Sequence, residues 1–351
     1  MKKSVSLHPE TYDAKTDMFV TLTAIAAALL AVLILAALVA GVAALFGASF
    51  VKVFRKGLWG LLLPPLMFLY GMFIGRNAYQ VKEVTVTDPR LPESFEGYRM
   101  VQISDLHLAS FRHRERSLEK AVEKIAALSP DMIVFTGDLV TSGPEEIAGF
   151  EPVLSSLKAP DGVYSVLGNH DYCVYRHWDS DSLRLEAVEK VVGMERSAGW
   201  SVLMNENVRV VRPSVSEAGG SDTLSVIGVE NISGHSFFRS YGDLDRAMEG
   251  AAGFKVLLSH DPTHWRTAAA QYPDIALTLS GHTHAMQLSV FGWSPSSLMY
   301  KEYRGLYEKW GKDGANRLYV NIGLGETAIP ARFGARPEIT LVKFSGGNRT
   351  E

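Results

Sequence analysis

The chain carries no charged residue from Met18 to Val51, and this run is rich in Ala, Leu and Val. A transmembrane helix needs roughly 20 apolar residues, and within lipid only a helix satisfies the backbone of a single segment. The run therefore predicts one membrane-spanning helix. The alternative, a signal peptide, has an apolar core of only about 7–15 residues, which is much shorter than this run.

A second uncharged run extends from Gly57 to Gly75 and stops at Arg76. Pro64-Pro65 is expected to kink it, which a membrane span tolerates where neighbouring groups satisfy the freed carbonyls. Together the two runs predict a membrane anchor of two transmembrane helices over residues 18–76, preceded by a tail at 1–17. A re-entrant second segment is the alternative.

The sidedness of this anchor depends on basic residues near its ends. Two spans place the tail and everything after the anchor on one side of the membrane. Lys52, Arg55 and Lys56 are expected in the connecting loop, which the positive-inside rule draws toward the cytoplasm, so that the part of the chain after the anchor faces outward. The opposite orientation, with the tail and the domain in the cytoplasm, is favoured almost equally by the basic residues of those segments, which are Lys2, Lys3, Lys15, Arg76 and Lys82.

The bulk charge does not favour a nucleic-acid partner, and the cysteine content excludes a disulfide-stabilised protein. A formal net charge of −3 provides no basic field to hold nucleic acid, so no nucleic-acid partner is expected. The single cysteine, Cys173, rules out an internal disulfide framework.

Beyond the anchor, short apolar runs alternate with helical patterns. A linker and first strand are expected at 77–97, an α/β domain at 98–345 and a tail at 346–351. In the domain, helices are expected at 114–128, 183–198 and 265–272, where apolar residues recur at helical spacing. Buried strands are expected at 98–104, 131–136, 162–167, 224–229, 254–259 and 275–280. This alternation implies sheets covered by helices, with the working residues in the loops at the strand ends.

Polar residues of only three types follow five of these strands. Five of the ten histidines come directly after apolar runs. Any one of these residues alone is more often a cap or a turn residue. The whole set comprises Asp105, His107, Asp138, Asn169, His170, Asp171, His260, His282 and His284.

Metal ions explain such a set best, because buried imidazoles and carboxylates are costly without positive charge among them. Oxygen and nitrogen ligands without a thiolate suit Mn, Zn or Fe and argue against a structural zinc site of the cysteine type. The number of candidate ligands is too large for one ion, so two divalent metal ions are expected.

The order of these motifs resembles the calcineurin-like metallophosphoesterases. The matching blocks are D-x-H, G-D, G-N-H-D, H and G-H-x-H. The resemblance implies a four-layer αββα sandwich, with two packed mixed sheets flanked by helices. The segments "GNHDYCVYRHWDS", "SHDPTHW" and "GARPEITLV" are similar to a membrane-anchored bacterial branch, the UDP-2,3-diacylglucosamine hydrolase-like phosphoesterases.

The resemblance also implies a ligand set for each metal. One metal is expected on Asp105, His107, Asp138 and His284, and the second on Asp138, Asn169, His260 and His282, so that Asp138 bridges them. If 282–284 is extended, His282 and His284 point the same way, and one turn serves both ions.

The expected catalysis is hydrolysis of a phosphoester by a hydroxide that bridges the metals. His170 is the candidate to stabilise or protonate the leaving oxygen, with Asp171 holding its ring. The alternative for both residues is a purely structural role.

The expected function is a membrane-anchored hydrolase of a phosphodiester or pyrophosphate bond in a nucleotide-linked lipid such as UDP-2,3-diacylglucosamine. Its expected partners are the bilayer and a phosphoester substrate. One alternative is the same core acting on soluble nucleotides, phosphoproteins or nucleic acid. Another is a non-catalytic scaffold of this fold. The sequence leaves the oligomeric state open.

Several further residues have two interpretations each. The cluster at 112–116, with Arg112, His113, Arg114 and Arg116, either guides an anionic substrate or begins a solvated helix. Arg176 and His177 are candidates to reach a second phosphate, and Asp261 and His264 to support the ligands. The aromatic and Met-rich segment Met286–Gly311 forms either a surface for acyl chains or the membrane, or the core of a hairpin.

Overall fold

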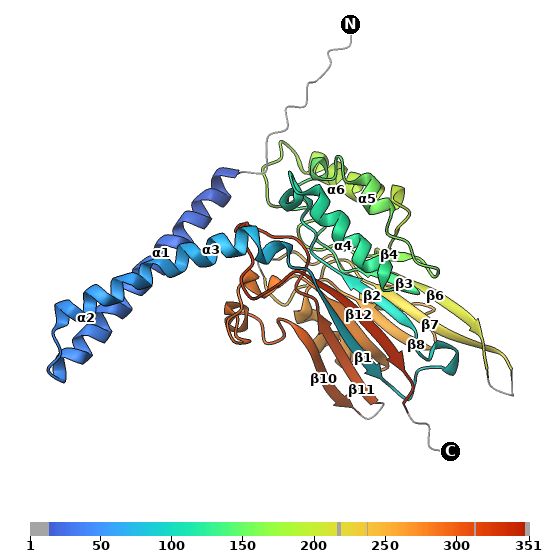
Figure 1. Cartoon of the computed structure of the whole chain (residues 1–351). Helices are drawn as coiled ribbons and strands as arrows, with labels where there is room; N and C mark the ends of the chain where they lie inside the picture. The colour runs from blue at the N-terminus through green and yellow to red at the C-terminus, as the bar shows by residue number, and fades with distance from the viewer. Residues whose placement is uncertain (1–13, 216–218, 237, 312–313, 348–351) are drawn as a thin grey trace, which may run out of the picture.

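The computed structural model describes residues 14–215, 219–236, 238–311 and 314–347. A helical hairpin at the N-terminus projects from an α/β domain that contains all of the described strands (Figure 1). The helices are α1 (Ala14–Leu45), α2 (Phe50–Gly57), α3 (Leu63–Phe73), α4 (Glu115–Ala127), α5 (Glu151–Ser155), α6 (Asp181–Ser197), α7 (Leu244–Met248) and α8 (Trp265–Gln271).

The hairpin consists of α1 and a second helical arm that runs from Phe50 to Asn77. Both arms are long and apolar enough to cross a membrane. In the first arm, the apolar stretch runs from Met18 to Leu45. The second arm passes through a 3-10 turn, Leu58–Leu62, before α3, because Pro64 and Pro65 lack the N–H groups that an unbroken α-helix requires. The expectation that Lys52, Arg55 and Lys56 lie in a loop is wrong, since all three lie within α2.

Two six-stranded mixed sheets form the centre of the domain. The first sheet has the order β1-β12-β2-β3-β4-β5, with β1 (Gln80–Thr87), β12 (Glu338–Ser345), β2 (Arg99–Ile103), β3 (Met132–Phe135), β4 (Val163–Ser165) and β5 (Ser201–Val202). The second has the order β10-β11-β9-β8-β7-β6, with β10 (Gly305–Gly311), β11 (Gly314–Val320), β9 (Ile275–Ser280), β8 (Phe254–Leu258), β7 (Ser221–Gly228) and β6 (Glu206–Pro213).

The strands that lead into the polar loops are parallel to one another within each sheet. In the first sheet β2, β3 and β4 are parallel, and in the second β7, β8 and β9 are parallel. Their carboxyl ends therefore meet at one edge of each sheet, which is where α/β proteins place their functional loops.

Three apolar layers hold the sheets and helices together. Met100, Val134, Val226 and Leu258 belong to the core between the two sheets. The outer face of the first sheet packs against α4 and α6, and the outer face of the second packs against α7 and α8. The predicted arrangement of two packed mixed sheets flanked by helices is therefore confirmed.

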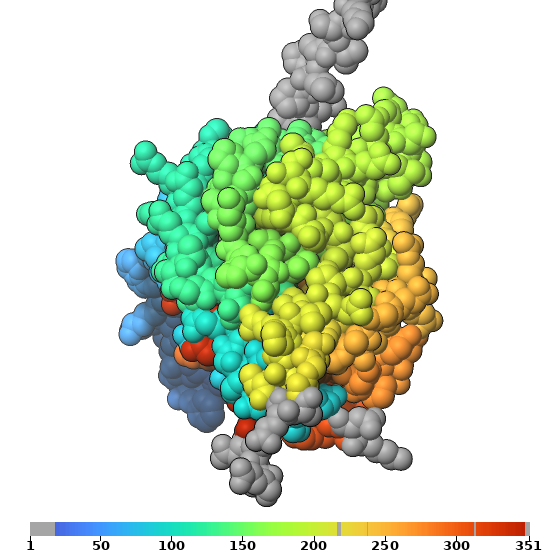
Figure 2. All heavy atoms as spheres, turned by 90° about the vertical axis from the view of Figure 1, so that its right-hand side faces the viewer, coloured from blue at the N-terminus to red at the C-terminus, as the bar shows by residue number. Residues whose placement is uncertain are grey.

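The hairpin is joined to the domain through the loop that precedes β12. The backbone N–H of Arg332 donates to the carbonyl of Gly71 over 3.2 Å, and the Tyr70 and Phe333 rings meet edge to face. A side chain at Gly75 would place its Cβ 1.8 Å from the carbonyl oxygen of Arg332, so this contact requires glycine. The side of the domain away from the hairpin is formed mainly by the middle of the chain, coloured from teal through green and yellow to orange, and the blue hairpin is visible only at the rim (Figure 2).

Candidate metal centre

The carboxyl ends of the parallel strands bring the predicted ligands together. Three groups of side chains have ligand atoms within 4.8 Å of one another. They are Asp105, His107 and His284, then His107, Asp138 and His170, and finally Asp138, His260 and His282. Asp138 belongs to two of these groups, although the assignment of individual side chains to metal ions stays a prediction.

In the first group, Nε2 of His284 lies 3.3 Å from a carboxylate oxygen of Asp105 and 3.2 Å from Nε2 of His107. The His107 Nε2 atom is in turn 3.6 Å from an Asp138 carboxylate oxygen. These nitrogen and oxygen atoms face a common point.

On the other side of Asp138, Nε2 of His260 lies 3.1 Å from the same Asp138 oxygen, Oδ2. It also lies 3.1 Å from the side-chain oxygen of Asn169 and 3.2 Å from Nδ1 of His282. The amide nitrogen of Asn169 donates to the Tyr175 hydroxyl over 2.7 Å, which directs the amide oxygen toward His260.

The backbone at five candidate ligands is left-handed, a conformation that is uncommon for residues other than glycine. The expectation that 282–284 is extended is wrong, because φ is +75° at His282 and +48° at His284. Asp105, His107 and Asp138 have φ values of +50°, +43° and +61°. Such strain costs free energy at each position and is concentrated at functional sites in proteins.

Glycines allow the ligand loops to approach one another. A Cβ at Gly168 would lie 2.2 Å from a carboxylate oxygen of Asp138, and a Cβ at Gly281 would lie 2.3 Å from one of Asp105. The glycines in the G-N-H-D and G-H-x-H motifs therefore leave room for the carboxylates of other loops.

Asp171 supports the loop that carries Asp138. Its buried carboxylate accepts hydrogen bonds from the backbone N–H groups of Asp138, Leu139 and Val140 at 2.8, 2.8 and 3.1 Å, and from Gly168 at 2.9 Å. The expectation that Asp171 holds the ring of His170 is therefore wrong. The Asp171 carboxylate already accepts four backbone hydrogen bonds, and these bonds hold the loop of Asp138 in position.

His170 is oriented by a backbone carbonyl. Its Nδ1–H donates to the carbonyl of Thr141 over 2.7 Å, which leaves Nε2 as the nitrogen that can take up or release a proton. The ring meets His107 edge to face at a centroid distance of 4.9 Å, and it is only partly buried. His170 thus lies at the border between the ligand groups and solvent.

The protonation pattern suits ligand nitrogens. Burial lowers the pKa of His282 to about 4 and holds the pKa values of His107 and His284 well below their usual range, so these rings are neutral with free lone pairs. Burial opposes a charge on His260 as well, but Asp138 outweighs it and raises the pKa of His260 to about 10. Asp138 therefore favours a protonated His260 when no cation is bound, and metal binding would release that proton.

The donor set fits divalent cations. It combines two buried carboxylates, an amide oxygen and buried imidazoles, and the only cysteine, Cys173, is not among the ligand groups. Burial, and then the nearby charge of Asp138, raise the pKa of Asp105 to about 7. Two carboxylates this close need a shared positive charge to remain ionised together.

Sequence reasoning missed Arg332, whose side chain is fully buried. Its guanidinium donates to the carbonyls of Gly325, Ala335 and Ile322, and one of its nitrogens lies 3.1 Å from Nδ1 of His284. Tyr300 was also missed, and its hydroxyl lies 2.9 Å from Nε2 of His282. Arg332 and Tyr300 lie outside the motifs, so the local sequence contains no signal for either.

Most of the weaker sequence candidates have structural partners. Arg114 forms an ion pair with the buried Glu326 at 3.1 Å, and Arg176 pairs with Glu145 and stacks over Trp178. Neither is thus a free substrate-binding cation. Asp261 caps the 3-10 turn Pro262–His264 through Thr263. A carboxylate oxygen of Asp261 also lies 3.7 Å from Nε2 of His282, which agrees with a supporting role.

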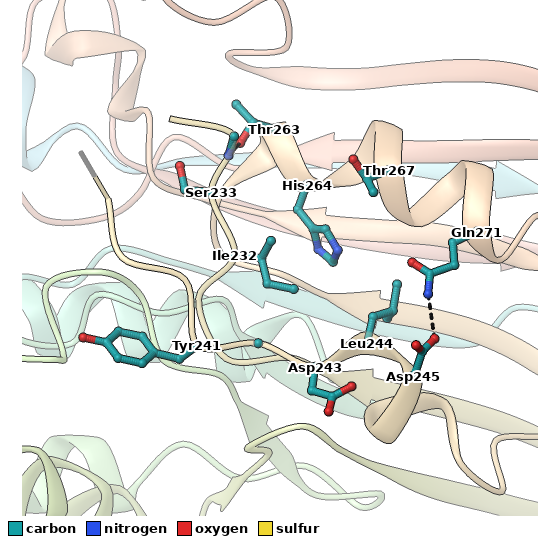
Figure 3. A pocket seen from close by; sticks show the side chains of 12 residues that line it. Ile232, Ser233, Tyr241, Asp243, Leu244, Asp245, Thr263, His264, Thr267 and Gln271 are labelled. Carbon is teal, nitrogen blue, oxygen red and sulfur yellow. Dashed lines mark hydrogen bonds between the residues drawn. The ribbon is translucent and has the colours of Figure 1, made fainter. Parts of the chain in front are cut away.

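A pocket of about 600 Å³ lies beyond the Asp261 loop and is lined in part by Ser233, Thr263 and His264 (Figure 3). Asp243 and Asp245 are also at its wall, but Asp243 caps α7 and Asp245 accepts a hydrogen bond from Gln271. None of the predicted metal ligands lines this pocket, so it is separate from the ligand groups.

The sequence model of the calcineurin-like phosphoesterase family matches residues 98–286. A zebrafish (Danio rerio) protein described as a transmembrane protein with metallophosphoesterase domain is 31% identical over 296 residues, which are 82% of this chain and 62% of that protein. The metallophosphoesterase YkuE of Bacillus subtilis is 29% identical over 306 residues, covering 84% of this chain and 97% of YkuE. UDP-2,3-diacylglucosamine pyrophosphatase LpxG of Chlamydia trachomatis is 27% identical over 325 residues, covering 81% of this chain and 94% of LpxG.

Proposed function

Because the chain belongs to the calcineurin-like phosphoesterase family, whose members are metal-dependent phosphoester hydrolases, we propose that it cleaves a phosphodiester or pyrophosphate bond in a nucleotide-linked lipid at a membrane. The observation that carries this proposal is the position of Asp138, which has one carboxylate oxygen 3.1 Å from His260 and 3.6 Å from His107. It lies between two ligand groups, in a domain to which an apolar hairpin is attached.

The three groups, together with Asn169, would provide ligands for two divalent cations of the Mn, Zn or Fe type. One ion would be held by Asp105, His107, Asp138 and His284, and the other by Asp138, Asn169, His260 and His282. When bound, such ions supply positive charge that attracts phosphate oxygens and lowers the pKa of water. The neutral imidazoles add no negative charge, so the site would keep an excess of positive charge for an anionic substrate.

The chain's own residues then serve the leaving group. In the hydrolysis, a water oxygen gives up a proton and forms a bond to phosphorus, while the bond from phosphorus to the leaving oxygen breaks and that oxygen takes up a proton. His170, held by Thr141 through Nδ1, presents Nε2 as the group that gives a proton to that oxygen. Asp171 acts at a distance by holding the backbone of Asp138 in place.

The hairpin supports the proposal that the site is attached to a membrane. We assign residues 18–76 to a two-span anchor, 77–97 to the linker and first strand, and 98–345 to the catalytic domain. The apolar arms Met18–Leu45 and Phe50–Asn77 support this division, as does the zebrafish relative, which is described as a transmembrane protein. LpxG, named for UDP-2,3-diacylglucosamine, suggests the substrate class.

The proposal is tested with membranes that contain the full-length chain, supplied with Mn²⁺ and UDP-2,3-diacylglucosamine while UMP release is followed. Asp138→Asn provides the blank. Metal-dependent UMP release that is absent from the mutant supports the lipid substrate. Cleavage of a simple aryl phosphodiester without UMP release would exclude this lipid and direct the search to soluble nucleotides, phosphoproteins or other phosphoesters. Loss of both reactions with metal bound would indicate a non-catalytic scaffold.

A further inference from the structure

The segment Met286–Tyr300, which we call the apolar lobe, contains no charged residue. It lies between β10 and the turn that carries His282 and His284, which we call the metal-binding turn. Its large apolar side chains face outward. Phe291 is fully exposed, Leu298 is 79% exposed and Trp293 is 51% exposed. Scattered exposed apolar residues are common, but a concentration of them on one uncharged segment marks an interaction surface.

The polarity of the lobe is inverted relative to that of a loop in water. Ser289, Ser294 and Ser296 are buried, while the aromatic and aliphatic side chains between them are exposed. The Ser294 hydroxyl donates to the carbonyl of Ala285, and the Ser296 hydroxyl donates to the carbonyl of Thr283. The serines therefore fasten the lobe to the metal-binding turn, and the apolar side chains remain on its outer face.

The tip of the lobe is a tight turn that fixes Phe291 in this outward position. Val290 and Trp293 exchange backbone hydrogen bonds of 2.9 and 3.0 Å. Phe291 and Gly292 between them have φ values of +49° and +89°, a pair of left-handed residues for which Asn-Gly is the favoured sequence. The backbone conformation does not favour phenylalanine at this position. Packing within the chain does not explain it either, because the ring is fully exposed.

The lobe is continuous with the part of the domain that receives the hairpin. Ser289 N–H donates to the carbonyl of Phe333 over 2.8 Å, and the Phe333 ring meets Tyr70 of α3 at a centroid distance of 5.6 Å. In Figure 1 the orange segment before β10 lies on the side of the domain from which the hairpin extends. The lobe and the end of the second arm are thus fixed to one loop.

The border of the lobe has the residues expected at a bilayer surface. Lys301 follows directly and is exposed, and Arg304 donates to Ser289 from the same border. Aromatic side chains such as Trp293 favour the interfacial layer of a bilayer, and adjacent cations favour anionic head groups.

From these observations we propose that the apolar lobe lies in the interfacial layer of the same membrane that the hairpin spans. The inference rests on the membrane anchoring proposed above and deepens it. The lobe begins two positions after His284 and ends at Tyr300, whose hydroxyl contacts His282. With the lobe in the interface, the metal centre opens next to the head groups, and a phosphoester of a lipid reaches it without leaving the membrane.

The position of the lobe can be measured without any turnover. Phe291→Cys, labelled with an environment-sensitive fluorophore, is reconstituted as the full-length chain in vesicles of zwitterionic and anionic lipids. Matched vesicles contain lipids with a spin-label quencher near the head group. The native Cys173 is fully buried and remains unlabelled in the folded chain. The control is Val211→Cys, which is exposed on β6. This strand lies on the side of the domain away from the hairpin (Figure 1).

We expect the label at 291 to emit at shorter wavelength than the label at 211 and to lose most of its emission in the quencher vesicles, whereas the label at 211 keeps its emission. Leu298→Cys should behave like the label at 291. Equal behaviour of 291 and 211, with quenching by aqueous iodide, would overturn the proposal.

Two other outcomes also overturn it and identify the reason. Shielding of 291 from iodide without quenching by the lipid label, reversed on dilution of the protein in the vesicles, would place a second copy of the chain on the lobe. Failure of the chain to float with the vesicles would overturn the anchoring and the position of the lobe together. A failed UMP assay with a quenched label at 291 would leave the lobe in the membrane and reject only the substrate.

Discussion

A guanidinium nitrogen of Arg332 lies 3.1 Å from Nδ1 of His284, while the backbone N–H of the same arginine donates to the carbonyl of Gly71 in the hairpin. One fully buried residue therefore contacts both a candidate metal ligand and the end of the proposed anchor. The guanidinium lies on the Nδ1 side of the His284 ring, so Nε2 of that ring points toward Asp105 and His107. The metal centre and the hairpin thus share one structural element, the loop before β12.

Replacing Arg332 should weaken both the fold and the first ligand group. Arg332→Met leaves the carbonyls of Gly325, Ile322 and Ala335 without their buried donor, a loss of roughly 3 kcal/mol in the free energy of unfolding. Denaturant titration in detergent and metal analysis measure the two effects. The control is Arg336→Met, an exposed arginine in the same loop. If both variants behave alike, Arg332 does not position His284.

Replacing Asp138 should affect both metals. Asp138→Asn keeps the size of the side chain but removes the charge shared between the two ligand groups, so we expect loss of activity and lower occupancy of both metal ions. Elemental analysis of the purified chain gives the metal content per molecule. Asp179→Asn, at an exposed position, should retain both ions. Loss of a single ion from the Asp138 variant would contradict the bridging assignment.

His170 should contribute to turnover but not to metal content. We expect His170→Ala to retain its metal and to lose on the order of 10² in kcat if the ring gives a proton to the leaving oxygen. Comparing substrates whose leaving groups differ in pKa separates this role from a structural one, because an acidic leaving group needs no proton. His177→Ala, at an exposed position in the same loop, serves as the control. An equal loss of rate for all leaving groups would remove His170 from proton transfer.

The contact between the hairpin and the domain should tolerate no side chain at Gly75. Gly75→Ala places a Cβ 1.8 Å from the Arg332 carbonyl oxygen, so the hairpin must shift, and we expect a loss of about 1–3 kcal/mol in the free energy of unfolding. Gly41→Ala in α1 is the matched control, because no heavy atom lies within 4 Å of its Cβ. Equal stability of the two variants, measured by denaturant titration in detergent, would show that the arm does not pack as described.

Stability should decrease in mild acid because of His264. Burial lowers the pKa of this histidine from its usual 6.5 to about 4, with Asp261 opposing the shift. Between these pH values the unfolded chain binds a proton that the folded chain does not, so the free energy of unfolding falls as pH falls from 6.5 to 4. The contribution is fully present above pH 6.5 and amounts to roughly 3 kcal/mol.

The variant His264→Gln tests this contribution. Denaturant titrations at pH 7 and pH 4.5 should show a smaller difference for this variant than for the unmodified chain or for His177→Gln, whose imidazole is exposed. An unchanged difference would assign the acid sensitivity to other groups.

Local sequence patterns predicted the apolar arms, the longer helices of the domain and six of the twelve described strands by their bounds. The uncharged runs before Arg76 predicted two apolar arms, since the length of such a run is a property of the chain itself. Each of the six predicted strands overlaps a strand of the structure. A buried strand is visible in the sequence because it is a short, nearly continuous run of apolar residues. Even the basic residues assigned to the wrong element, Lys52, Arg55 and Lys56, lie close to the turn between the arms.

The candidate ligands were predicted for the same reason. A side chain that directly follows a parallel strand has its position set by that strand, and the carboxyl ends of neighbouring strands meet at one edge. Asp105, Asp138 and His260 therefore come together in the structure as their places in the sequence indicate.

The partners of these residues were decided only by the tertiary structure. Arg332 is 48 positions from His284 and still farther from Gly71, and no periodicity reports which buried groups meet across such separations. Asp171 was assigned to the neighbouring His170, yet it binds the backbone around Asp138, because the packing of two loops determines which donors are unpaired. A sequence pattern records which residues are buried or polar, but hydrogen-bond partners depend on how distant segments pack in three dimensions.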